Sequence, residues 1–322
     1  MSCAAGCSSC QNGVCIMHAA YGDGSQVYGA VKQDIIKIGG LSATGPAAIS
    51  YLQTSDFASL GGGTYMDGLW GMAYDTFNGG LPTVVDSLVS AGMPNVFSMC
   101  FSNNGGYLVM GGINTAYQTS AAQYTPITQQ TYYSFNIGNV KVGGTPLGVS
   151  MPGAILDSGT TFAYVPQTVY TAMQNALINA GMNSGFFIAV GARPMCVTQV
   201  GLVPALAFTL PAVGGGTFDL SLTFSQYTMD CGGGTRAFNF IPVADGQMTI
   251  FGDSFMQAFN NIFDRQNSQL GFAPVSSSCI GTVSLNTQSY QVPGTKSQFS
   301  DAAAVIPSIA IVCLSIALFL FF

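Results

Sequence analysis

Apolar and polar residues alternate in several stretches of the chain, and long amphipathic helical runs are absent from the sequence. Such alternation is typical of strands that bury one face. We expect strands within 27–40, 96–101, 107–112, 133–144 and 206–228, and a closing hairpin at 261–274. Apolar residues at helical spacing predict only short helices, at 81–91 and from Pro166 to Ala180. The pattern predicts an all-β fold with short helices and many turns.

Two stretches resemble one another and indicate an internal repeat. Residues 66–74 and 248–255 each read as an apolar strand that contains or precedes Gly. Gly within a strand allows another backbone segment to approach closely. We therefore expect both stretches to lie where strands cross in the core.

Composition sets limits on the partners of this chain. Its 322 residues can bury a sizeable core, as one large β domain or two lobes. Charged residues make up only 6% of the chain, and the formal charge is −6. Nucleic-acid binding needs a basic patch, and this sequence has none, so no nucleic-acid partner is expected. Hydrophobic residues at 48% argue against disorder.

Nine cysteines indicate an oxidising compartment. Cys313 lies in an apolar tail, which leaves an even number for disulfides: Cys3, Cys7, Cys10, Cys15, Cys100, Cys196, Cys231 and Cys279. The first four also have a spacing that zinc sites use. The single His gives no second metal signature, so we expect local disulfides in a loop over 1–20, and no metal or cofactor.

The two ends of the chain carry further expectations. Residues 281–300 are rich in Ser, Thr and Gln and read as a tether. Residues 301–322 form a hydrophobic tail, which fits a GPI signal or a transmembrane helix and predicts membrane association. Residues 1–20 contain no apolar signal-peptide core, so the true N-terminus is expected upstream.

One carboxylate stands out by its context, in the run Ile155-Leu156-Asp157-Ser158-Gly159-Thr160-Thr161. Apolar residues bring a buried strand to a turn, where Gly allows a tight bend and hydroxyls hydrogen-bond the charged acid. An ordinary Asp-Ser-Gly turn between strands is the simpler interpretation.

This run resembles the active-site signature of the pepsin-like aspartic proteases. Tyr21-Gly22-Asp23-Gly24-Ser25 resembles the flap of that family, and the motifs at 66–74, 107–112, 248–255 and 261–274 follow in the family's order. The resemblance implies a bilobal pepsin-like fold with an incomplete first lobe at 1–122 and a second lobe at 123–280.

The resemblance also implies roles for individual residues. Asp157 corresponds to a catalytic acid, Thr160 to the hydroxyl that braces its loop, and Gly159 to backbone that approaches substrate. Tyr21 and Gly22 correspond to the substrate-covering flap. Disulfides are implied for two pairs, Cys196 with Cys231 and Cys100 with Cys279.

The family's catalytic chemistry needs a second carboxylate, and this sequence contains one Asp-Ser-Gly motif and no Asp-Thr-Gly. The family's first motif precedes the flap by several tens of residues. One expectation is an aspartic endopeptidase that acts on peptides or proteins in the secretory pathway, at the cell surface or in acidic vesicles, with its first motif encoded upstream. The alternative is a catalytically inactive, membrane-anchored relative that binds peptides or serves as a surface protein.

Overall fold

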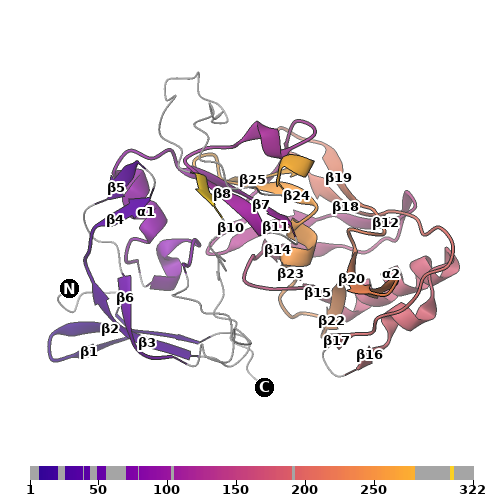
Figure 1. Cartoon of the computed structure of the whole chain (residues 1–322), viewed down its shortest axis with the longest axis horizontal. Coiled ribbons are helices and arrows are strands. Elements are labelled where there is room, and N and C mark those ends of the chain that lie inside the picture. Colours follow the sequence, from indigo (N-terminus) through magenta and orange to yellow (C-terminus); the bar gives the residue numbers. More distant parts are fainter. Residues whose placement is uncertain are drawn as a thin grey trace. The chain divides into compact units, whose positions relative to one another are not determined.

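The computed structural model describes residues 7–20, 26–38, 40–43, 49–55, 70–78, 80–102, 105–190, 193–279 and 305–307 (Figure 1). The chain divides into two compact units. One comprises residues 1–98, 107–114 and 281–322, and the other residues 99–106 and 115–280. The division of lobes at 122/123 stays a prediction.

The first unit contains a four-stranded sheet in the order β1-β2-β3-β6 and a small β4–β5 hairpin. Its elements are β1 (Ser9–Gln11), β2 (Val14–Ala20), β3 (Gln26–Lys32), β4 (Ile36–Ile38), β5 (Leu41–Ala43), β6 (Ile49–Ser55), a 3-10 helix (Asp75–Asn78) and α1 (Val84–Ser90). Strands β7 (Val96–Ser102) and β8 (Gly105–Met110) contain residues of both units, and β26 (Val305–Pro307) pairs with β8. Strands β3, β4, β7 and β8 confirm the strands expected within 27–40, 96–101 and 107–112.

The expectation of a loop over residues 1–20 is wrong for the part that the structure describes. β1 and β2 pair as an antiparallel hairpin with Gln11 opposite Val14. The two residues between them, Asn12 and Gly13, have φ of 51° and 78°. Asn-Gly readily adopts the left-handed backbone of a two-residue hairpin turn, so this dipeptide predicts that the strands on either side of it pair.

The expected strand at 66–74 is also wrong where it can be tested. Residues 66–69 lie outside the described residues, and residues 70–74 form no strand. Met72, Ala73 and Tyr74 are nevertheless buried. Consecutive apolar residues can fill a core without pairing in a sheet, which is why apolar character alone misidentified this segment.

α1 confirms the helix expected at 81–91, with a later start. Thr83 caps it: its Oγ1 accepts from Asp86 N, and the Asp86 carboxylate accepts from Thr83 N at 2.8 Å. This reciprocal arrangement is a capping box, which fixes where a helix begins.

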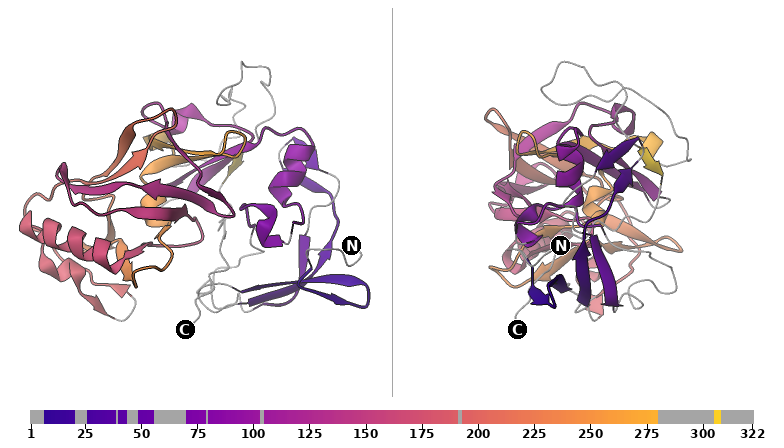
Figure 2. Two further views of the ribbon diagram at one scale, coloured as in Figure 1. Left: turned by 180° about the vertical axis from the view of Figure 1, so that it is seen from behind. Right: turned by 90° about the vertical axis from the view of Figure 1, so that its left-hand side faces the viewer.

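The second unit contains a six-stranded sheet, a four-stranded sheet, the strands β24, β25 and β9 of a further sheet, small hairpins and short helices (Figure 2). Its strands are β9 (Gln123–Pro126), β10 (Gln129–Gln130), β11 (Tyr133–Ile137), β12 (Asn139–Val142), β13 (Thr145–Pro146), β14 (Met151–Leu156), β15 (Ala163–Pro166), β16 (Ala189–Val190), β17 (Arg193–Pro194), β18 (Leu206–Pro211), β19 (Thr217–Leu222), β20 (Thr228–Gly232), β21 (Thr235–Phe238), β22 (Phe240–Val243), β23 (Ile250–Phe251), β24 (Phe259–Asp264) and β25 (Gln269–Pro274). Its helices are α2 (Gln167–Asn179), α3 (Asp253–Met256) and 3-10 turns at Thr115–Tyr117, Ser184–Phe187 and Ser277–Cys279.

One sheet of this unit, in the order β10-β11-β14-β23-β15-β22, determines where the Asp-Ser-Gly turn lies. β14 runs parallel to β23, and β23 runs antiparallel to β15. Fully buried aromatic rings, including Phe135, Phe208 and Phe251, fill the core beside it. The expected hairpin at 261–274 is confirmed, because β24 and β25 pair from Phe259–Pro274 to Asp264–Gln269.

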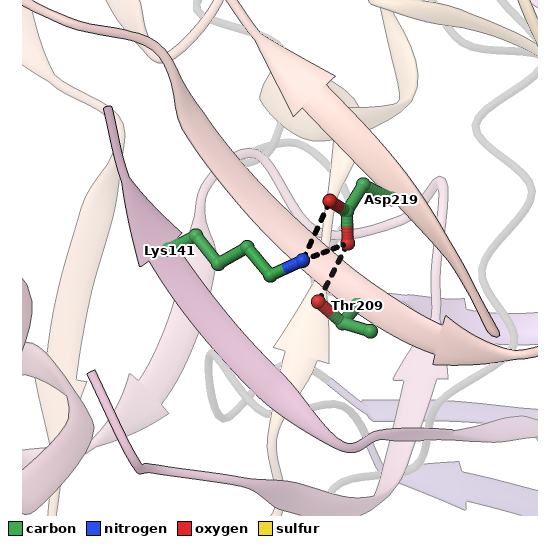
Figure 3. Close-up of polar contacts among 3 residues, drawn as sticks. All are labelled: Lys141, Thr209 and Asp219. Atoms are coloured by element: carbon green, nitrogen blue, oxygen red, sulfur yellow. Dashed lines mark hydrogen bonds and ion pairs between the residues drawn. The ribbon is translucent and has the colours of Figure 1, made fainter. Parts of the chain in front are cut away.

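The four-stranded sheet of this unit, in the order β13-β12-β18-β19, carries an ion pair across three strands (Figure 3). Lys141 Nζ lies 3.0 and 2.8 Å from the two carboxylate oxygens of Asp219, and Thr209 Oγ1 donates to Asp219 Oδ1 at 2.6 Å. The two charged side chains are partly exposed, at 23% and 37%. Exposed pairs contribute little to stability, so this one chiefly helps to fix the register of the strands.

The expected tether at 281–300 lies outside the described residues, as does the 301–322 tail apart from β26. Within the part of the chain that the structure describes, no helix combines the length and apolar character needed to cross a bilayer.

α2 confirms the helix expected after Pro166, and a distant carboxylate caps it. Pro166 offers no side-chain hydrogen bond at the N-cap, but Asp245 Oδ1 accepts from both Thr168 N and Thr168 Oγ1 at 3.0 Å.

We expect Asp245→Ala to lower the free energy of unfolding by about 1 kcal/mol. Urea denaturation measures this loss. Asp245→Asn keeps the acceptor oxygen and should restore most of the stability; equal losses in the two variants would contradict the capping role.

Candidate active site

Asp157 occupies the end of β14, where the strand leaves the core. Its side chain is only 1% exposed, and Leu156 before it is 2% exposed. Asp157 N donates to Phe251 O at 3.0 Å, so the pairing of β14 with β23 continues up to the acid itself. The strand therefore holds this carboxylate in a fixed position at a buried strand end.

The turn after the strand directs two hydrogen-bond donors at the carboxylate. Gly159 N donates to Asp157 Oδ1 at 3.0 Å, and Thr160 Oγ1 donates to Asp157 Oδ2 at 2.5 Å. Both donors stabilise negative charge on the acid. The structure thus brings together three of the predicted site residues, and Thr160 contacts the acid directly. Their catalytic and substrate-binding roles stay predictions.

A close backbone approach from β23 and α3 fixes this turn. A Cβ atom on Gly252 would lie 2.1 Å from Thr160 O and 2.5 Å from Phe162 O. Asp253 N donates to Thr160 O at 2.7 Å and Ser254 N to Thr161 O at 3.0 Å. Only Gly leaves room for these contacts, which agrees with the close crossing expected of the 248–255 repeat.

Asp253 is a second acid of this unit that affects the site. Burial raises the pKa of Asp253, and the negative charge of Asp157 raises it further, to about 8. Asp253 Oδ1 has no hydrogen-bond partner within the described residues. Two ionised carboxylates near one another in a buried region repel, so Asp253 keeps its proton at acid and neutral pH.

Tyr132 also lies within electrostatic reach of Asp157. Burial raises its pKa, and the Asp157 charge adds to this effect. Tyr132 directly precedes β11, which pairs with β14 through Ser134 and Ile155. Sequence reasoning missed both Tyr132 and the electrostatic role of Asp253, since neither belongs to the Asp-Ser-Gly run.

The predicted flap residues Tyr21 and Gly22 lie outside the described residues. The strands on either side of them are described. β2 and β3 pair antiparallel up to Ala20 opposite Gln26. The roles of Tyr21 and Gly22 stay predictions.

Three disulfides join described cysteines to one another. Cys196 pairs with Cys231, Cys100 with Cys279, and Cys7 with Cys15. Cys10 is disulfide-bonded as well. The sulfurs of Cys7, Cys10 and Cys15 are therefore used in disulfides, which removes the thiolates that the zinc alternative needs.

Comparison with known proteins agrees with this geometry. The family model described as eukaryotic aspartyl protease matches residues 4–275. An aspartic protease of Phaffia rhodozyma is 30% identical over 257 residues, which cover 79% of this chain and 62% of that protein. Pepsin A of Rhinolophus ferrumequinum is 28% identical over 272 residues, covering 81% of this chain and 66% of that protein. Cathepsin E-A of Xenopus laevis is 28% identical, covering 79% and 64%.

The chain therefore belongs to the eukaryotic aspartyl protease family, and its pepsin-like, mostly β fold agrees with the expected fold class. It spans 62–66% of the length of these three curated relatives.

Proposed function

We propose that this chain is part of an aspartic endopeptidase in which Asp157 is one carboxylate of the catalytic dyad. The observation that carries the proposal is the buried Asp157 carboxylate, which accepts from Gly159 N and Thr160 Oγ1 at the end of a core strand. Family membership supports the same reaction class.

The chemistry needs two carboxylates that share one proton. Like charges in close contact cannot both ionise, so one acid acts as base and the other as acid. The base removes a proton from water, the water oxygen attacks the peptide carbonyl, and the protonated acid polarises the carbonyl oxygen. Asp157 provides one of these groups, and its two donors hold it in position.

We further propose that the second acid comes from an Asp-Thr/Ser-Gly motif encoded before Met1. The sequence contains a single Asp-Ser-Gly, and the matched relatives are longer than this chain. Substrates are peptides or proteins in an acidic, oxidising compartment of the secretory pathway or at the cell surface. The apolar tail at 301–322 provides attachment to a membrane, as a GPI signal or a spanning helix.

The test joins the chain to whatever its transcript encodes upstream and incubates the protein with a mixed peptide library at acid pH. We expect cleavage that pepstatin inhibits. A folded protein with no cleavage, or a transcript with an in-frame stop just before Met1, would overturn the dyad proposal. Either result would favour the inactive, peptide-binding alternative.

A further inference from the structure

Two apolar side chains protrude from the second unit. Val200 is 85% exposed and Leu202 is 98% exposed, the two highest values among the large hydrophobic residues that the structure describes. Gly201 between them has φ of +88°, which turns the backbone at this point. We call residues 200–202 the apolar tip. Such exposure means that the tip is convex and lies in no groove of its own unit.

The segment that carries the tip is held on both sides. Gln199 Nε2 donates to Gly181 O at 3.1 Å, and its Oε1 accepts from Asn183 N at 2.9 Å. On the other side, Tyr227 OH donates to Pro204 O at 3.0 Å. The disulfide between Cys196 and Cys231 holds the start of the segment. These contacts keep the tip extended toward solvent, although folding the apolar residues inward would remove them from water.

The segment that carries the tip is itself neutral. No Asp, Glu, Lys or Arg occurs from Pro194 to Phe218, and the residues that bind Gln199 are uncharged. The charged residue that pairs with the segment, Arg236, does so at Val197, at its base. Moving charged groups out of water is expensive, whereas moving Val and Leu is favourable. A surface that inserts into an apolar medium needs exposed apolar side chains without charged residues beside them.

We propose that the apolar tip inserts into a lipid bilayer at the boundary between headgroups and acyl chains. A bilayer buries a convex apolar projection without any complementary shape, whereas a protein partner must offer a matching hollow. Leu and Val are also under-represented among the residues that dominate protein interfaces. Independently of the tip, the chain contains a long apolar run over 302–322, which is itself suited to a membrane. The proposal does not depend on the catalytic assignment.

The test uses the full chain reconstituted with phosphatidylcholine vesicles, and the probe is an indole introduced by Leu202→Trp. Fluorescence is compared on vesicles with ordinary and with brominated acyl chains, and the unmodified protein, with Trp70 alone, sets the baseline. We expect about a twofold fall in the added fluorescence, because interfacial segments sit about 5–10 Å into the headgroup and acyl boundary, where bromine quenches. High salt should leave the quenching unchanged, because the tip carries no charge.

Val213→Trp is the matched control. Val213 is 48% exposed, lies at a Gly-rich turn between β18 and β19, and belongs to the same charge-free run. We expect no added quenching there. Near-ultraviolet circular dichroism confirms that each variant is folded. Absence of quenching at position 202, or equal quenching at positions 202 and 213, overturns the proposal. The first result shows that the tip does not enter the bilayer, and the second that the contact with lipid is not specific to the tip.

Discussion

Asp157→Asn is expected to abolish peptide hydrolysis by the complete protein while leaving it folded. The substitution keeps size and hydrogen-bonding capacity but removes the ionisable group that the proposed dyad needs. The Asn oxygen can still accept from Gly159 N, and the Thr160 hydroxyl can rotate to accept from the new amide. General acid–base groups contribute roughly 10²–10⁴-fold, so kcat/KM should fall by at least about 10²-fold.

Kinetics at acid pH with a single fluorogenic peptide measure this loss, and a thermal melt shows that folding is kept. Asp230→Asn makes the same chemical change in the exposed β20–β21 hairpin, where Asp230 Oδ1 accepts from Gly232 N at 2.8 Å. That variant should keep full activity. Undiminished cleavage by Asp157→Asn would show that Asp157 is only an ordinary turn residue.

The sequence predicted the local parts of this site well, because they depend on adjacent residues. Apolar residues up to Leu156 specify a buried strand, and Ser158, Gly159 and Thr160 specify the turn that follows. The cap of α1 could likewise have been predicted, since Thr83 and Asp86 are three residues apart. The Asn12–Gly13 turn could also have been predicted, because Asn-Gly favours a two-residue hairpin turn, but the segment was interpreted as a loop from its cysteine-rich composition.

Contacts between distant residues could not be predicted in this way. Asp245 caps α2 through Thr168, which lies 77 positions earlier in the sequence. Asp253 comes near Asp157 only because β23 lies beside β14 in the sheet, a parallel pairing that local periodicity does not specify. The pKa of Asp253 depends on burial and on that neighbour, so it follows from tertiary packing alone.

Asp253 should make the protein less stable as the pH rises through the acid and neutral range. Its pKa is raised from 3.8 to about 8 in the folded state, by burial first and by the Asp157 charge second. In the unfolded chain the carboxyl releases its proton near its ordinary pKa, so between these two values the unfolded state binds fewer protons. The contribution to stability is complete below about pH 4 and is lost as the pH rises to about 8.

Asp253→Asn removes this titration and keeps the size of the side chain. We therefore expect the free energy of unfolding of the variant to rise relative to that of the unmodified protein by several kcal/mol between pH 4 and pH 8, as measured by urea denaturation at each pH.

Asp219→Asn is the matched control. Burial opposes ionisation of Asp219, but hydrogen bonds from Lys141 and Thr209 and the Lys141 charge outweigh it and lower its pKa. The stabilisation from Asp219 is thus present above the ordinary pKa and is lost only in stronger acid, so the difference between this control and the unmodified protein should stay constant from pH 4 to pH 8. If the Asp253→Asn difference is equally constant, Asp253 is already ionised in the folded protein, and its proposed electrostatic coupling to Asp157 is wrong.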